Sequence, residues 1–179
     1  MPRNVEFKAR PRDWEGQLRL ASEIAPVHQV VEQEDVFYAV ARGRLKLRTV
    51  RDAGGTRLAA ALILYDRPDR PGPKTSDYHV VAVPDPEALG AVLAAACGAE
   101  RVVRKRRTRL LLGPASVHFD EVEGLGRFIE VEVAVDAATS TEHAAALAEE
   151  WRRRLGVRTE DLIPGAYADL LSGPTAPRP

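Results

Sequence analysis

The sequence predicts an α+β protein, mainly β, in which eight antiparallel strands form a closed barrel with helices packed on its outside. Eight segments show the period-two or β-rich patterning of strands. Short connections containing glycine or proline join most of them, which favours hairpins over parallel crossover units. Charged side chains are also sorted by strand, which is the observation that favours closure.

The predicted strands follow one another along most of the chain. Turn signals such as Ala41-Arg42-Gly43 and Gly113-Pro114 supply the residues that tight antiparallel connections need. The strands are expected over residues 4–10, 35–41, 43–51, 56–67, 76–83, 101–112, 115–122 and 126–135.

Helical patterning fills the gaps between the strands. Helices are expected over residues 12–25, 86–97 and 141–155, the third with Thr141 as its N-cap. A last short helix is expected over residues 159–172. We expect one domain over residues 1–173 and a flexible tail over residues 174–179, because prolines and a glycine crowd the C-terminal end.

Composition bounds the class of protein. The 179 residues are 45% hydrophobic and 29% charged, enough for one sizeable core. Lys plus Arg and Asp plus Glu are 26 each, which excludes the strongly basic balance of a dedicated nucleic-acid binder. One cysteine, Cys97, excludes an intrachain disulfide. Without an apolar signal or membrane-length run, a cytoplasmic setting is expected, and the four scattered histidines are interpreted as ordinary.

Reading alternate residues shows what each strand face offers. Arg44, Lys46 and Arg48 share one face, opposite Leu45 and Leu47. Three like charges in a row repel one another unless an anion lies among them.

The first and last strands carry carboxylates on the corresponding face. In the first strand Glu6 precedes Lys8 and Arg10, and in the last strand Glu130 and Glu132 alternate with apolar residues. The simpler alternative, half-buried strands with solvated polar faces, stays open at this point because most amphipathic antiparallel sheets are built that way.

If the charged faces line a closed barrel, its interior carries more cations than carboxylates. The excess of four positive charges matches a polyanion such as a triphosphate, which arginine forks grip well. Paired carboxylates on one strand are suited to Mg²⁺ or Mn²⁺. The expected interior cations are Lys8, Arg10, Arg44, Lys46, Arg48, Arg67, Lys105 and Arg107, and the expected carboxylates are Glu6, Asp120, Glu130 and Glu132.

These residues resemble a known family, the CYTH superfamily or triphosphate tunnel metalloenzymes, over nearly the whole chain. The segment Asn4-Val5-Glu6-Phe7-Lys8 is similar to its Glu-x-Glu-x-Lys signature, with Asn4 where the signature has its first acid. The matches continue in family order through Gly43-Arg44-Leu45-Lys46-Leu47-Arg48, Tyr65-Asp66-Arg67-Pro68, Val103-Arg104-Lys105-Arg106-Arg107 and the block from His118 to Glu132. That block looks closest to the prokaryotic class IV adenylate cyclase-like branch.

The resemblance implies an eight-stranded tunnel that binds a triphosphate through basic residues and divalent metal ions. By position, the eight cations named above correspond to phosphate ligands, and Glu6, Asp120, Glu130 and Glu132 to ligands of Mg²⁺ or Mn²⁺. Glu6, Lys8, Glu130 and Glu132 correspond to catalytic residues. A neutral amide at Asn4 is a poorer partner for a hard dication than a carboxylate.

Three functions are compatible with the pattern. The first is hydrolysis of inorganic triphosphate, ATP or another organic triphosphate. The second is an adenylate cyclase that makes cyclic AMP and pyrophosphate. The third, motivated by Asn4, is a non-catalytic module that binds polyphosphate or nucleotides. The expected partner is the small-molecule triphosphate, without nucleic acid or membrane, and the resemblance is compatible with a homodimer.

Overall fold

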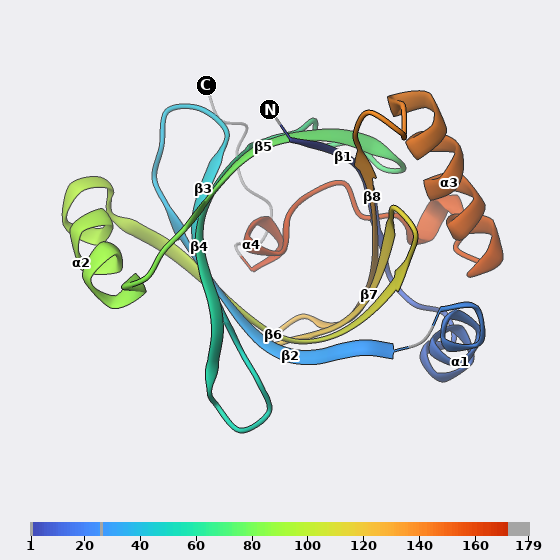
Figure 1. Ribbon diagram of the computed structural model, residues 1–179, viewed down its shortest axis with the longest axis horizontal. Helices are drawn as coiled ribbons and strands as arrows, with labels where there is room; N and C mark the ends of the chain where they lie inside the picture. The colour runs from blue at the N-terminus through green and yellow to red at the C-terminus, as the bar shows by residue number, and fades with distance from the viewer. Residues whose placement is uncertain (1, 26, 172–179) are drawn as a thin grey trace.

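Eight strands close into one barrel in the computed structural model, which describes residues 2–25 and 27–171 (Figure 1). The predicted tail over residues 174–179 lies outside the described residues. The strands are β1 (Arg3–Ala9), β2 (Val27–Tyr38), β3 (Arg44–Arg51), β4 (Arg57–Asp66), β5 (Lys74–Ala82), β6 (Ala99–Leu112), β7 (Ala115–Val122) and β8 (Gly126–Val135).

The strand order around the barrel is β1-β5-β4-β3-β2-β6-β7-β8, and every neighbouring pair is antiparallel. The barrel closes where β1 pairs with β8, which places Glu6 opposite Glu132 and Lys8 opposite Glu130. The prediction of a mainly β protein with a closed antiparallel barrel is therefore confirmed.

The second strand is longer than the sequence predicts. It begins at Val27 rather than at residue 35, and it pairs with β6 over nearly all of that length. Within the missed part, Val31 and Gln33 are buried while Glu32 is exposed. Because an inward-facing glutamine interrupts the apolar alternation, the segment does not show the pattern on which the prediction depended.

Three helices lie outside the barrel, as predicted (Figure 1). They are α1 (Trp14–Ile24), α2 (Pro86–Cys97) and α3 (Thr141–Arg154). α1 and α3 lie on one side of the barrel, and α2 stands apart on the opposite side (Figure 1).

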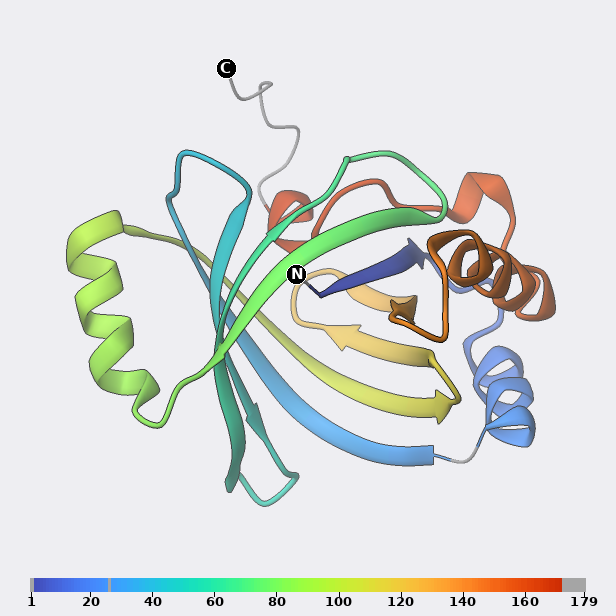
Figure 2. The same ribbon diagram turned by 45° about the horizontal axis from the view of Figure 1, so that its top comes forward.

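The C-terminal part differs from its prediction. Instead of one helix over residues 159–172, there is a 3₁₀ helix η1 (Thr159–Asp161) and a short α4 (Tyr167–Leu170). Pro164 and Gly165 lie between them and interrupt the helix, because proline has no N–H to donate. α4 lies across one end of the barrel rather than on its outer wall (Figures 1 and 2), where Tyr167 and Ala168 pack with Phe37, Val103 and Phe128.

The main apolar core lies between the barrel wall and the helices. Val5, Phe7 and Ala9 on the outer face of β1 pack in the same cluster as Phe119 of β7 and Trp151 of α3. Since the apolar faces point outward to α1 and α3, the alternate polar faces point into the barrel. In the described residues, no helix has both the length and the apolar character needed to cross a membrane.

The start of α3 provides a first test. Ser140, and not the predicted Thr141, is the N-cap, because its side chain accepts a hydrogen bond from the His143 backbone N–H at 3.2 Å. We expect Ser140→Ala to lower the free energy of unfolding by about 1 kcal/mol, since α3 packs on the barrel through Ala144, Ala148 and Trp151. Urea denaturation measures this. Thr141→Ala is the matched control, and an equal loss in both variants would contradict the assignment.

Candidate functional site

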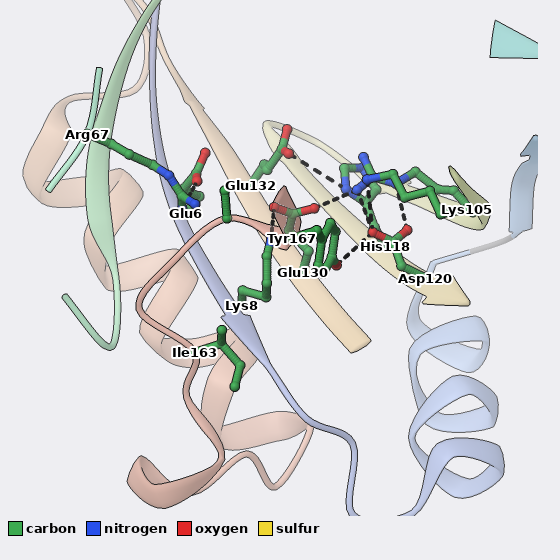
Figure 3. Close-up of polar contacts among 12 residues, drawn as sticks. Glu6, Lys8, Arg67, Lys105, His118, Asp120, Glu130, Glu132, Ile163 and Tyr167 are labelled. Carbon is green, nitrogen blue, oxygen red and sulfur yellow. Dashed lines mark hydrogen bonds and ion pairs between the residues drawn. The ribbon is translucent and has the colours of Figure 1, made fainter. Parts of the chain in front are cut away.

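Charged side chains line a cavity of about 200 Å³ inside the barrel (Figure 3). They come from five of the eight strands and from the loop after β4, so closure of the barrel is what brings them together. Among the described residues, the lining cations are Lys8, Lys46, Arg48, Arg67 and Lys105, and the lining carboxylates are Glu6, Asp35, Glu130 and Glu132.

The seam between β1 and β8 carries the first group of contacts. Lys8 Nζ lies 2.6 Å from Glu130 Oε1, and Arg67 Nη1 donates to Glu6 Oε1 at 2.5 Å. Glu132 lies opposite Glu6, and its side chain is 32% exposed. The structure thus brings together Glu6, Lys8, Glu130 and Glu132, the four residues that the resemblance implies to be catalytic.

Asp120 anchors a second group of contacts at the α4 end of the barrel. Its fully buried carboxylate accepts hydrogen bonds from Lys105 Nζ at 3.2 Å, from Arg107 Nε at 2.7 Å and from the Tyr167 hydroxyl at 2.9 Å. Burial by itself would raise the pKa of Asp120, but the charges of Arg107 and Lys105 outweigh it and lower that pKa. Asp120 is therefore ionised, with both carboxylate oxygens in use.

Asp35 forms a third group and was absent from the predicted site. It is buried, and it accepts from Lys46 Nζ at 3.1 Å and from Arg48 Nε at 2.7 Å. Burial opposes its ionisation, but the charges of Arg48 and Lys46 lower its pKa nonetheless. The alternation within the predicted strand 35–41 would have placed Asp35 on the same face as Phe37, which also lines the cavity.

Two predicted phosphate ligands lie away from the cavity lining. Arg10 is exposed, donates to the Leu125 carbonyl at 2.7 Å and stacks on the ring of Phe128. Arg44 pairs with Asp69 and Asp169 at 2.6 and 2.9 Å. Both follow the alternation of their strands but lie at the strand ends, beyond the cavity.

The charge excess of the lining is consequently one rather than the predicted four. Asp35 adds a carboxylate to the lining and the buried Asp120 is missing from it, while three of the predicted cations, Arg10, Arg44 and Arg107, do not line the cavity. Arg107 is buried behind it and holds Asp120 and Glu130. Ions removed from water need partners of opposite charge, so an unbalanced interior would be costly in the free protein.

Lysine protonation responds to this environment. Burial and the neighbouring Arg48 charge lower the pKa of Lys46 to about 8, although Asp35 opposes them. Burial and Arg107 also lower the pKa of Lys105. The cavity thus contains a lysine that titrates just above neutral pH.

His118, interpreted as ordinary from the sequence, lies beside the carboxylates of β8. It is buried and pairs with Glu130 across β7 and β8, and its Nδ1 lies 3.8 Å from Glu132 Oε1. Burial and the charge of Arg107 lower its pKa to about 3, so the ring is neutral. Neither ring nitrogen has a hydrogen-bond partner among the described residues. Alternation on β7 places His118 on the same face as Asp120, a signal that the spacing of histidines along the chain could not provide.

The residues fit a divalent cation. One ligand atom each from His118, Glu130 and Glu132 lie within 4.8 Å of one another, and Glu130 and Glu132 are two of the predicted metal ligands. Of the other two, Asp120 is paired with Lys105, Arg107 and Tyr167, and Glu6 with Arg67. An orphaned imidazole beside two carboxylates is the donor chemistry that a divalent metal ion uses.

A closed antiparallel barrel with cations and carboxylates facing inward is a recognisable class of protein. The CYTH domain pattern matches residues 2–167, so the chain belongs to the CYTH domain family. No curated protein matches the chain.

Solved structures share the fold. The chain is 23% identical to the PH1012 protein of Pyrococcus horikoshii OT3, with a TM-score of 0.78 over 95% of this chain and 99% of that one. It is 16% identical to a candidate adenylate cyclase of Vibrio parahaemolyticus, with a TM-score of 0.69 and coverage of 95% and 98%. It is also 16% identical to HpAC1 of Hippeastrum, reported to have a dominant triphosphatase activity, with a TM-score of 0.61 and coverage of 99% and 98%.

The two kinds of carboxylate in the barrel should differ in their effect on stability. Asp120→Asn leaves the buried Lys105 without its anion and the buried Arg107 with only Glu130, and we expect it to lower the free energy of unfolding by about 3–5 kcal/mol. Glu132→Gln removes a partly exposed charge that faces Glu6, so we expect little change or a small gain. Urea denaturation at pH 7 compares the two variants, and equal losses would contradict this division.

Proposed function

We propose that the chain binds a triphosphate inside the barrel and hydrolyses it with the aid of a divalent metal ion. The observation that carries the proposal is Arg67. Its guanidinium faces the cavity, one nitrogen pairs with Glu6, and its buried Nε has no hydrogen-bond partner in the part of the chain that the structure describes. A buried charged donor without an acceptor is costly, and a phosphate oxygen in the cavity would satisfy it.

The other lining cations support the same ligand. Lys46 and Arg48 share one carboxylate, Asp35. Lys105 likewise shares Asp120 with Arg107. Because two cations divide each anion, their remaining N–H groups are available to phosphate oxygens. A triphosphate carries several negative charges, and it would neutralise the cations that these carboxylates leave incompletely paired.

The residues also divide the work of hydrolysis. Water attacks the terminal phosphorus, the bridging P–O bond breaks, and phosphate and diphosphate are formed. Lys8 and Arg67, which line the same cavity as Glu6, would donate to the phosphoryl oxygens and stabilise their charge in the transition state. His118, Glu130 and Glu132 would hold a divalent cation, which supplies charge neutralisation and orients water when bound.

The position of α4 favours hydrolysis of the triphosphate group over a reaction that also requires a nucleoside in the barrel. Tyr167 lies inside the α4 end, within 4.0 Å of Lys8 Nζ and 4.8 Å of Lys105 Nζ as measured to the ring centroid. Val80 of β5 both lines the cavity and is 50% exposed, so the cavity opens to solvent there, and a triphosphate would enter from that opening with any organic group outside. The triphosphatase activity reported for the Hippeastrum protein, which shares the fold, agrees with this choice.

The direct experiment offers the purified chain inorganic triphosphate or ATP with Mg²⁺ or Mn²⁺. Release of orthophosphate without cyclic AMP supports the proposal. Cyclic AMP as the main product would replace it with the cyclase, and binding without turnover would leave only the binding module.

Arg67 supplies a sharper test. Arg67→Gln should weaken triphosphate binding about tenfold or more, because it removes a buried charge-assisted contact. The rise in melting temperature that saturating triphosphate produces by linkage should shrink accordingly. Arg70→Gln, an exposed arginine three residues further along the same loop, is the matched control. Equal thermal shifts in the two variants would contradict the assigned role of Arg67.

The lowered pKa of Lys46 predicts that triphosphate affinity depends on pH. Its pKa of about 8 in the free protein means that the cation is present below pH 8 and is lost as the pH rises above it. Triphosphate binding favours the charged form, so the affinity should fall above pH 8, by up to about tenfold per pH unit for one coupled proton. Lys46→Arg keeps its charge and should lose less affinity between pH 7.5 and 9. If calorimetry shows that the triphosphate affinities of the wild type and of Lys46→Arg change with pH in the same way, Lys46 is not a ligand.

A further inference from the structure

His118 is a buried polar side chain with no hydrogen bond to the rest of the described chain. It is 3% exposed, yet neither of its ring nitrogens has a hydrogen-bond partner among residues 2–25 and 27–171. A neutral imidazole has one N–H to donate and one lone pair to offer, and leaving both unused in the interior costs free energy. The neighbouring interior residues, by contrast, form the close ion pairs described above.

The surroundings of His118 indicate what kind of ion its ring nitrogen could bind. Glu132 Oε1 lies 3.8 Å from Nδ1, and Glu130 lies directly across the strand pair. Figure 3 shows the ring between Glu132 and the group formed by Lys105 and Asp120. Two carboxylates and an imidazole lone pair converge on one point, which an anion would avoid and a cation would prefer.

The spacing is close to what one metal ion requires. Ligand atoms of His118, Glu130 and Glu132 lie within 4.8 Å of one another. Two donors on opposite sides of a first-row metal ion lie about 4.2 Å apart, given bonds of about 2.1 Å. Small rotations of the two glutamate side chains would close that difference.

The existing ion pairs of Glu130 leave it able to bind a metal ion as well. Lys8 occupies Oε1 and Arg107 occupies Oε2, but each carboxylate oxygen can accept a second contact. Glu132 is the more available ligand, since its side chain is 32% exposed and lines the cavity.

We propose that His118, Glu130 and Glu132 form a nitrogen- and oxygen-donor site selective for a first-row transition metal ion, with Mn²⁺ bound in preference to Mg²⁺. The inference deepens the proposed function and rests on it for its biological use, because the site opens on the same cavity. Its chemistry follows from the donors: Mg²⁺ takes oxygen ligands in strict octahedral geometry and keeps its waters, whereas a site with a nitrogen donor binds the divalent first-row transition metals, from Mn²⁺ upward, with affinities that increase along the series.

Pulsed electron paramagnetic resonance of Mn²⁺ added to the whole chain tests the nitrogen ligand directly. We expect a ¹⁴N hyperfine coupling from a directly bound imidazole. Its absence from the wild-type spectrum, with Mn²⁺ shown to be bound, would overturn the proposal whether or not any variant folds.

The variant His118→Gln should lose that coupling. It should also lose about tenfold or more in Mn²⁺ affinity, as measured by calorimetry without triphosphate, while Mg²⁺ affinity changes less than about twofold. His79→Gln is the matched control, since His79 is an exposed histidine on β5. Equal losses for Mn²⁺ and Mg²⁺ in a folded His118→Gln would overturn the selectivity.

The measurements separate this inference from the proposed function. Orthophosphate release from triphosphate together with a nitrogen-free Mn²⁺ spectrum would reject the His118 site and leave the hydrolase in place. A nitrogen-coupled Mn²⁺ spectrum without triphosphate turnover would support the site and reject the hydrolase.

Discussion

Charge pairing inside the barrel is the constraint on which the remainder of the site depends. A carboxylate removed from water stays ionised only where cations or hydrogen-bond donors replace the solvent. Asp120 shows this most clearly, because Lys105, Arg107 and Tyr167 surround it and connect β6, β7 and α4 through one side chain. Once such pairs are fixed, the cations are held at set positions with part of their donor capacity unused, so the interior is organised before a ligand arrives.

The arrangement of apolar and polar surfaces makes this interior possible. In many small barrels side chains fill the centre, and the barrel itself is the core. Here the principal apolar cluster lies outside the wall, where Phe7 and Phe119 pack together with Trp151 of α3. Stability therefore depends on helices that never contact the cavity. The inward-facing residues can then be selected for binding anions and cations, at the cost of keeping their charges balanced.

The period-two strand pattern and the charged residues at alternate positions predicted the closed barrel and most of its inward-facing residues. Once a strand is identified, alternation determines which side of the sheet each of its side chains faces. Alternation does not fix depth along the barrel, which is why Arg10 and Arg44 were predicted as ligands although they lie at its ends. Alternation also does not show which side chains on neighbouring strands form ion pairs. The partners of Asp35 and His118 lie on neighbouring strands, and the register that brings them together is defined only in the folded chain. The helix break at Pro164, which places Tyr167 in the end of the barrel, likewise depends on tertiary packing.

The seam between β1 and β8 has a consequence for how the protein is made. Lys8 and Glu130 face each other across this seam, 122 residues apart along the chain. A nascent chain can pair β1 with β5, but the other edge of β1 stays without its partner until β8, the last strand, has been synthesised, and the entropy of closing so long a loop makes that pairing slow. The seam that joins Glu6 and Lys8 to Glu130 and Glu132 therefore forms in one late step, when the barrel closes.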